Sequence, residues 1–398
     1  MLLCSLTGCA TISPATRARQ EADAAPAVAA LQAAQFEQAA KLSAQSLERD
    51  ASNARAHAVA ALARFVSVNR TLASDVMTLG ASLMLSGALR SSFVDLELFD
   101  PAFDRAEARL QEVAHHLEAA AADPGVSLEL CLACWEVDWN RNGQLDDFDR
   151  RLFEVERDAE GTLLPEGDPR RRPTFRFDLA DLHWLGALVS FERAALELTR
   201  AWDLSALVRV AIASRSADDV KLPLRSAERA RHAHALLLEG LSESRACRAA
   251  ALLETDDDRE WLPNPGQRSH PVPLEVDAPL YQTWSTTLDE LDALLRSQKG
   301  LDLAQLASLV EPKEGRRLEV HGFVDVGRFL TLPAEITLST RAARREELDA
   351  FFAGVFGAAW VKSMPPSGLG QQLERLRGEV VQHRGTFEQK LRYLLWFN

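Results

Sequence analysis

The sequence predicts a mainly α-helical protein with a small β-hairpin near its C-terminal end. Over long stretches, apolar residues recur every three or four positions, the spacing that places them on one face of a helix. The clearest stretch is Asp100–Ala122, with Pro101 near its start and apolar residues at Phe103, Ala106, Leu110, Val113 and Leu117. Of the 398 residues, 47% are apolar, which is enough for packed cores.

The β-hairpin is predicted within Arg317–Ser339. Here Val, Ile, Leu and Phe side chains lie among Gly322, Gly327 and Pro333, and this mixture of strand and turn residues is typical of a hairpin. We expect the last region, residues 311–398, to consist of this hairpin and C-terminal helices.

Residues 1–24 contain the sequence Leu6-Thr7-Gly8-Cys9, which resembles the lipobox of bacterial lipoproteins. The resemblance implies a lipid on Cys9, a polar tether over Ile12–Ala25, and an outer-membrane lipoprotein that faces the periplasm. Only Met1–Gly8 precedes the cysteine, which is short for a secretion signal unless the true start lies upstream. The alternative is a chance motif in a cytoplasmic protein.

Residues 25–122 are expected to form a helical region that begins with a pair of helices. Gln35–Asn53 contains an aromatic residue, small residues and a closing Asp-x-x-Asn, and it resembles the second half of a tetratricopeptide repeat. The resemblance covers one repeat and has Ala51 in place of the usual proline, whereas a solenoid needs at least ~3 stacked repeats. A generic helical hairpin is the equal alternative.

A calcium site is predicted within residues 123–205, at the twelve-residue segment Asp138–Asp149. Calcium takes about six to eight oxygen ligands, and a twelve-residue loop supplies them from its positions 1, 3, 5, 7, 9 and 12, with Gly at position 6. Gly143 holds position 6, and the ligand positions are occupied by Asp138, Asn140, Asn142, Gln144, Asp146 and Asp149.

We expect a helix on either side of this loop. The incoming helix would carry Leu130, Cys134 and Val137 on one face, and the outgoing helix would carry Leu152, Phe153 and Val155. The segment thus resembles an EF-hand, and Asp149 in place of the usual Glu is more similar to the loops of dockerin modules. Because no second loop lies nearby, the sensing and cohesin-binding roles of those families are not expected, and bound Ca2+ would be structural. The alternative is a surface loop that mimics the pattern.

Other charged residues of this region are predicted to serve the scaffold. Arg170–Arg172 would pair with nearby carboxylates or stay solvated, because exposed charge is the usual state of arginine, and the alternative is a site for a phosphate or an acidic partner. Asp178 and Asp181 would cap the helix Leu179–Trp202, a role we favour over a second metal site.

Residues 206–310 are predicted to contain the helices Ser226–Leu253 and Leu280–Ser297, separated by a long proline-rich loop, Asp256–Pro279. Loops of that length often bind ligands. With polar groups such as His270, the loop is the candidate site of an enzyme or a transport-associated component. A linker held in place by Trp261 explains it equally well.

The composition and the missing motifs exclude several function classes. The chain has 45 basic and 58 acidic residues and a net charge of −13, so electrostatic binding to nucleic acid or an anionic membrane is not expected. No phosphate-binding glycine loop, serine-nucleophile elbow or zinc-protease helix occurs. Cys131 and Cys134 have redox spacing, but packing is favoured, because the predicted helix is the wrong context for a redox pair.

The sequence therefore favours a calcium-binding lipoprotein of the bacterial cell envelope that acts by contact as a scaffold or protein-interaction module. A protein partner is expected, and no catalytic residue is identified. The alternatives are an envelope enzyme or transport component that uses the loop Asp256–Pro279, and a calcium-responsive regulator.

Overall fold

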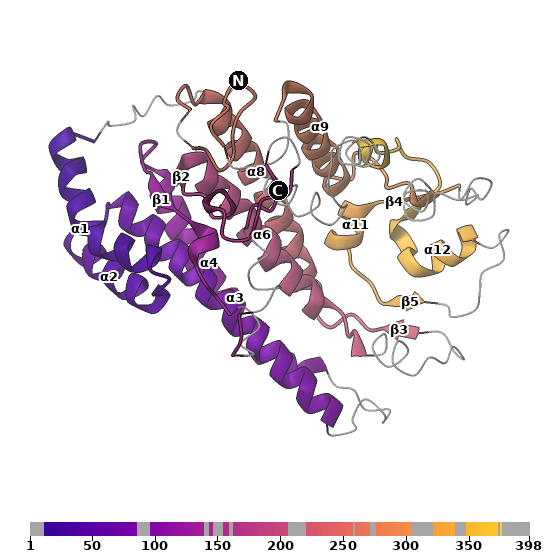
Figure 1. The fold of residues 1–398 in the computed structure, drawn as a ribbon. Coiled ribbons are helices and arrows are strands. Elements are labelled where there is room, and N and C mark those ends of the chain that lie inside the picture. Colours follow the sequence, from indigo (N-terminus) through magenta and orange to yellow (C-terminus); the bar gives the residue numbers. More distant parts are fainter. Residues whose placement is uncertain are drawn as a thin grey trace.

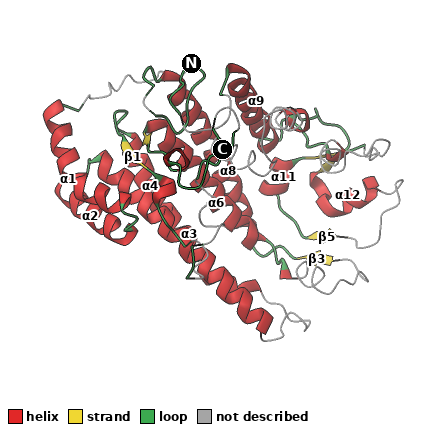
Figure 2. Ribbon diagram, in the orientation of Figure 1, coloured by secondary structure: helices red, strands yellow, loops and turns green. Residues whose placement is uncertain are grey.

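The computed structural model shows a mainly helical protein (Figures 1 and 2), as predicted. It describes residues 12–85, 96–138, 143–145, 154–158, 162–205, 220–257, 259–270, 276–304, 321–338, 348–372 and 375. Within these ranges, none of the helices has both the length and the apolar character needed to cross a membrane.

Three helices form the N-terminal layer: α1 (Pro14–Gln32), α2 (Phe36–Arg49) and α3 (Ala54–Leu85). Ser13 caps α1 by accepting the N–H of Thr16, and α1 packs on α2 and α3 with Ala24 fully buried. The prediction of a polar tether over Ile12–Ala25 is therefore wrong, because the small apolar residues of this segment are part of a packed helix. A helical hairpin is present at the start of the chain.

The turn between α2 and α3 explains the Asp-x-x-Asn motif. The Asp50 carboxylate accepts the N–H of Ser52 at 3.0 Å, and the Asn53 side chain accepts the N–H of Ala56 at 3.0 Å, which caps α3. The Asn53 amide also donates to the carbonyl of Gln20 at 2.9 Å and so ties this turn to α1.

The far end of α3 extends away from the rest of the molecule (Figure 1). Val76 and Met77 are 37% and 62% exposed. Among the described residues, this end of α3 therefore exposes apolar side chains to solvent.

The centre of the fold is formed by α4 (Asp100–Ala121), α6 (Leu179–Ala201) and α8 (Ala227–Leu253), where α6 packs against both of the others. All three lie within two residues of the helices predicted from the apolar spacing. Ala106, Leu110, Val113 and Leu117 of α4 are buried in the main core. Asp178 and Asp181 form a capping box at the start of α6, and Ser226 caps α8.

A small antiparallel ribbon covers one end of this layer. It consists of β1 (Leu128–Leu130) and β2 (Phe175–Phe177), with Leu128 opposite Phe177. Phe175 packs on Trp261 with a ring-centroid distance of 4.6 Å, and Trp261 is 1% exposed. The ribbon thus joins α6 to the loop that follows α8.

The C-terminal part contains α9 (Ala278–Leu295), α11 (Val326–Thr331) and α12 (Leu348–Phe356). Two short antiparallel pairs supply β-structure here: β3 (Val220–Leu222) with β5 (Ile336–Leu338), and β4 (Phe323–Val324) with β6 (Trp360–Val361). Both β4 and β5 lie within the predicted segment Arg317–Ser339, but each pairs with a strand outside it and not with the other. Val326 and Phe329, expected in the hairpin, instead belong to α11, because the Asp325 carboxylate caps a helix at this point by accepting the N–H of Arg328. Four 3-10 turns complete the described elements: η2 (Leu96–Phe99), η3 (Leu132–Cys134), η4 (Pro169–Arg171) and η6 (Gly357–Ala359).

Candidate metal centre

The structure describes the start of the predicted calcium loop. The Asp138 Oδ2 atom accepts the backbone N–H of Gly143 at 2.8 Å, and Gly143 has φ +83°, in the left-handed region that glycine tolerates. This bond links position 1 of the predicted loop, Asp138, to the glycine at position 6. Gln144 follows on the exposed side. Asn140, Asn142, Asp146 and Asp149 lie outside the described residues.

The segment before the loop differs from the prediction. Leu130 ends strand β1, Cys134 ends the 3-10 turn η3, and Val137 is buried and not helical. The prediction of a helix leading into the loop is therefore wrong. Alternate residues are buried from Val126 to Leu132, the period of a strand and not of a helix.

A disulfide joins Cys131 to Cys134 directly before the loop. The interpretation of their spacing as that of packing residues within a helix is wrong, because the two sulfurs are bonded and η3 is a 3-10 turn. Cys134 lies on the surface, whereas Cys247 is a fully buried free thiol. The disulfide closes the turn that carries the chain toward Asp138.

Two arginines and a glutamate support the other side of the loop. Arg171 donates to Glu154 at 2.8 Å and Arg172 donates to the same carboxylate at 3.3 Å. The Val155 N–H donates to the carbonyl of Arg171 at 2.9 Å. The scaffold role predicted for the arginines is confirmed for these two pairs. Val155 is buried but not helical, and Leu152 and Phe153 lie outside the described residues.

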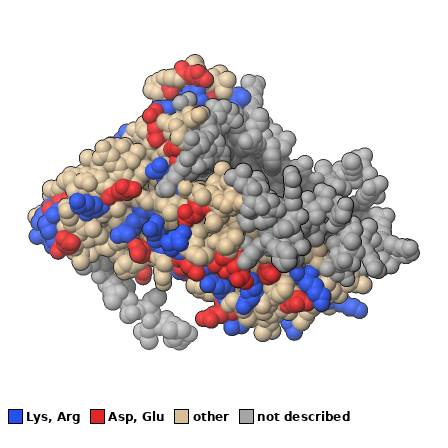
Figure 3. Space-filling model, turned by 90° about the horizontal axis from the view of Figure 1, so that it is seen from below, with Lys and Arg blue, Asp and Glu red and all other residues tan. Residues whose placement is uncertain are grey.

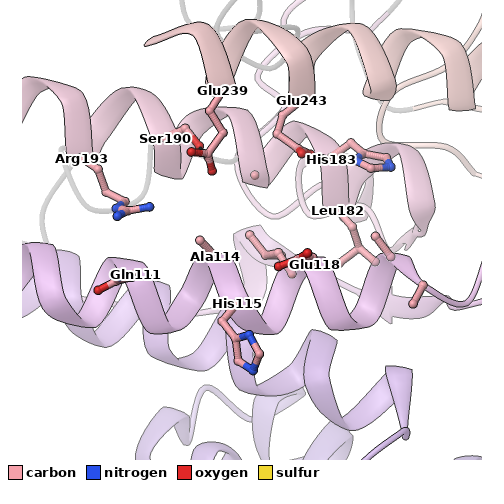
Figure 4. Close-up of a pocket in the computed structure, with 14 residues that line it drawn as sticks. Gln111, Ala114, His115, Glu118, Leu182, His183, Ser190, Arg193, Glu239 and Glu243 are labelled. Carbon is pink, nitrogen blue, oxygen red and sulfur yellow. Dashed lines mark hydrogen bonds and ion pairs between the residues drawn. The ribbon is translucent and has the colours of Figure 1, made fainter. Parts of the chain in front are cut away.

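A groove of about 610 Å³ lies between α4, α6 and α8 (Figure 4). One wall comes from α4 with Gln111, His115 and Glu118, and α8 contributes Glu239 and Glu243 from the opposite side. Along its floor, α6 places His183, Ser190 and Arg193. The groove is thus a helical surface whose charged lining consists of three glutamates and one arginine, and no described residue of the loop Asp256–Pro279 lines it.

Two pairs of polar side chains connect α6 to α8 within the groove. His183 Nδ1 lies 2.7 Å from a Glu243 carboxylate oxygen, and the Ser190 hydroxyl donates to Glu239 at 3.3 Å. Gly186 permits the close approach of α6 and α8, since a Cβ there would lie 3.0 Å from the Glu243 carboxylate. On the face shown in Figure 3, basic side chains lie in separate groups beside acidic ones.

A second acidic cluster lies at the junction of α6, α8 and β2. Asp178 is the first residue before α6, Glu254 is the first residue after α8, and Glu260 forms a β-bridge with Arg176 of β2. Carboxylate oxygens of Asp178, Glu254 and Glu260 all lie within 4.8 Å of one another. The sequence did not predict this cluster, because residues about eighty positions apart meet only in the folded chain.

Burial dominates the electrostatics of this cluster. It raises the pKa of Asp178, and together with the neighbouring charges of Asp178 and Glu260 it raises the pKa of Glu254 to about 8. Asp181, 1% exposed, has a pKa well above its usual value because of burial and the charge of Asp178. These carboxylates repel one another whenever they are ionised together.

The loop after α8 is tightly bonded over its described residues. The Asn264 amide donates to the carbonyls of Ala251 and Glu254, and the Gln267 amide donates to the Glu254 side chain at 3.2 Å. The Trp261 ring is buried against Phe175, as the packed-linker interpretation expects. Cys9, the predicted lipidation site, lies outside the described residues.

Comparisons of the chain with protein-family models, with curated proteins and with solved structures found no significant match.

Proposed function

We propose that the chain is a calcium-binding protein of the bacterial cell envelope that acts as a scaffold for a protein partner, and that its bound calcium is structural. The proposal rests on the contact between the Asp138 carboxylate and the N–H of Gly143. This contact links positions 1 and 6 of the predicted loop, which hold its first ligand and its turn glycine. Of the predicted ligands, Asp138 and Gln144 are described, the first half-buried and the second exposed.

The surroundings of the loop support a structural role for the ion. The Cys131–Cys134 disulfide lies shortly before the loop, and the ion pairs of Glu154 with Arg171 and Arg172 lie shortly after it, so both flanking segments are cross-linked or paired. An ion between such ends stabilises the folded chain by binding to it and not to the unfolded chain.

The envelope location is supported by the lipobox-like Cys9 and by the disulfide, because disulfides persist mainly in oxidising compartments such as the periplasm. Calcium is also more abundant outside the cytoplasm, so a weak site would be filled there. The acidic groove on α4, α6 and α8 is the surface we assign to the partner, which would present basic side chains.

Unfolding in calcium and in chelator tests the calcium proposal. Chelation lowers the melting temperature of the wild-type chain by a few degrees, and Asp138→Ala reduces the part of that shift that the loop supplies. The matched control is Asp289→Ala, at a 70% exposed aspartate on α9, which leaves the response to calcium unchanged. An Asp138→Ala chain that responds to calcium like the wild type contradicts the proposal.

Fatty-acid labelling tests the anchor. In a bacterial host that expresses the chain behind a complete lipoprotein signal, label is incorporated into the wild type and is lost in Cys9→Ser. Equal labelling of the two chains, or none in either, contradicts lipidation at Cys9.

A further inference from the structure

We propose that Asp178, Glu254 and Glu260 form a second divalent-cation site, which takes calcium in preference to magnesium. The site is separate from the predicted calcium loop, and its three ligands come from the start of α6, the end of α8 and the loop after α8. It does not depend on the function proposed above.

The spacing of the oxygens suits one ion. When three atoms lie no more than 4.8 Å apart, a central point exists at most 4.8 Å divided by √3, about 2.8 Å, from each. Calcium binds oxygen at about 2.3–2.6 Å and tolerates irregular geometry, whereas magnesium requires about 2.1 Å and a near-ideal octahedron. A small inward movement of the side chains is enough for calcium.

Asp181 gives an independent indication of a ligand. It lies at the third position of α6 and is 1% exposed. Its Oδ2 atom accepts the backbone N–H of Asp178 at 2.8 Å, which holds the carboxylate beside the cluster. Its buried Oδ1 atom has no hydrogen-bond partner among the described residues, and the charges of Asp178, Glu254 and Glu260 all act on it. A buried carboxylate oxygen in that position requires a proton or a cation.

The balance of charge favours the cation. The basic side chain beside the cluster is Arg176, and its guanidinium donates to Asp256 at 2.8 Å, so a fifth carboxylate already shares its charge. Removing several carboxylates from water without a matching positive charge is costly, and a bound divalent ion offsets the cost.

A second cluster of possible metal ligands differs from this one in its neighbouring charges. Glu107, Glu197 and His232 also have ligand atoms within 4.8 Å of one another. There, Arg193 donates to Glu107 at 2.9 Å, Arg229 donates to Glu197 at 3.1 Å, and Arg200 is paired with the same Glu197. That group is neutralised by protein cations, so we assign no metal to it.

The bound ion would fasten three parts of the fold that are distant in sequence. Asp178 also accepts the N–H of Ala180 at the start of α6, and Glu254 also accepts from Gln267. An ion shared by these carboxylates holds the α6 and α8 ends together and fixes the loop that carries Trp261. The ion would therefore have a structural role. Its protein ligands are all oxygens, which disfavours zinc.

The test uses a chain in which both Glu254 and Glu260 are replaced, Glu254→Gln with Glu260→Gln. Glutamine keeps the shape of each side chain and removes the like-charge repulsion. In chelator the variant is therefore at least as stable as the wild type, and in calcium it lacks the wild-type rise in melting temperature that the cluster supplies. A variant that is less stable in chelator and keeps the full calcium-induced rise overturns the proposal.

Terbium, a luminescent substitute for calcium, gives a second measurement in case the variant does not fold. In an Asp138→Ala chain the loop site is lost, so terbium emission on tryptophan excitation comes from the cluster beside Trp261, and Trp261→Phe reduces it several-fold. Emission that is unchanged by Trp261→Phe, or that is absent from Asp138→Ala, contradicts the second site. A result in which Asp138→Ala alone changes nothing refutes the loop and leaves the cluster standing, so the two proposals fail separately.

Discussion

A pair of histidines, one buried and one half-buried, makes the protein less stable in mild acid. His57 of α3 and His116 of α4 have their Nδ1 atoms 2.9 Å apart, and His57 Nε2 lies 3.0 Å from the carbonyl oxygen of Ala51. Since a carbonyl only accepts, His57 donates from Nε2 and accepts at Nδ1, and His116 donates from its Nδ1. The His57 ring is therefore neutral, and burial lowers the pKa of both histidines, that of His116 to about 4.

The sign of the effect follows from proton linkage. Between the unfolded pKa of 6.5 and the folded pKa of about 4, the unfolded chain binds the proton that His116 refuses, so stability falls as the pH falls. At about pH 5, the difference between the folded and unfolded pKa values of His116 corresponds to a loss of about 2 kcal/mol in the free energy of unfolding. His116 is partly exposed, and solvent screening reduces the expected loss to roughly 1 kcal/mol.

The assay compares urea unfolding of the wild type and of His116→Asn at about pH 7.5 and about pH 5. Asparagine can still donate to His57 but does not titrate in this range. On acidification from about pH 7.5 to about pH 5, the free energy of unfolding of the wild type falls by roughly 1 kcal/mol more than that of this variant. Glu192 and Glu254, with raised pKa values of about 7 and about 8, act with the opposite sign, but both chains contain them, so their effect cancels in the difference. The control is His232→Asn, at an exposed histidine of α8. A difference that is independent of pH refutes the reasoning.

Two further predictions concern a close helix contact and the disulfide. Gly327→Ala lowers the free energy of unfolding in urea by about 2 kcal/mol, because the added Cβ would lie 2.2 Å from the Leu295 carbonyl oxygen. The control is Gly80→Ala on α3, where the Cβ would meet no other atom, and this substitution is neutral or stabilises the chain by up to about 1 kcal/mol. Equal effects of the two substitutions contradict the contact. Cys131 and Cys134 react with a thiol reagent only after reduction, and replacing both by serine costs about 1–2 kcal/mol, so labelling of either without reductant contradicts the disulfide.

The sequence predicted the long central helices well, because their apolar faces and end signals are local. Asp178 and Ser226 cap α6 and α8 at the expected ends, and the buried face of α4 has the predicted spacing. The mainly helical fold follows from these signals alone.

The segment before the calcium loop was harder to predict, because two periodicities compete over a few residues. Leu130, Cys134 and Val137 share a helical face, but Leu128 and Leu130 alternate with exposed residues, and pairing with β2 decides the outcome. A strand that short is stabilised by its partner at Phe175–Phe177, which lies too far along the chain for a local pattern to reveal.

The candidate sites divide in the same way. The calcium loop is contiguous, so its ligand pattern is legible in the sequence, and the structure describes its start at Asp138 and Gly143. The cluster of Asp178, Glu254 and Glu260 depends on how α6 and α8 meet, and the predicted capping role of Asp178 hid its second environment. Capping and cluster membership are compatible, because the capping bonds use the backbone N–H groups of α6 and leave carboxylate oxygens facing Glu254 and Glu260.

Isothermal titration with calcium measures how many ions each chain binds, and the full-length Cys9→Ser chain, which cannot be lipidated at that position, is the parent. When Asp138→Ala is added to this parent, the chain is expected to bind one calcium ion fewer, whereas adding Asp289→Ala leaves the number of bound ions unchanged. Equal stoichiometry and affinity in the Asp138→Ala and parent chains would contradict the calcium loop.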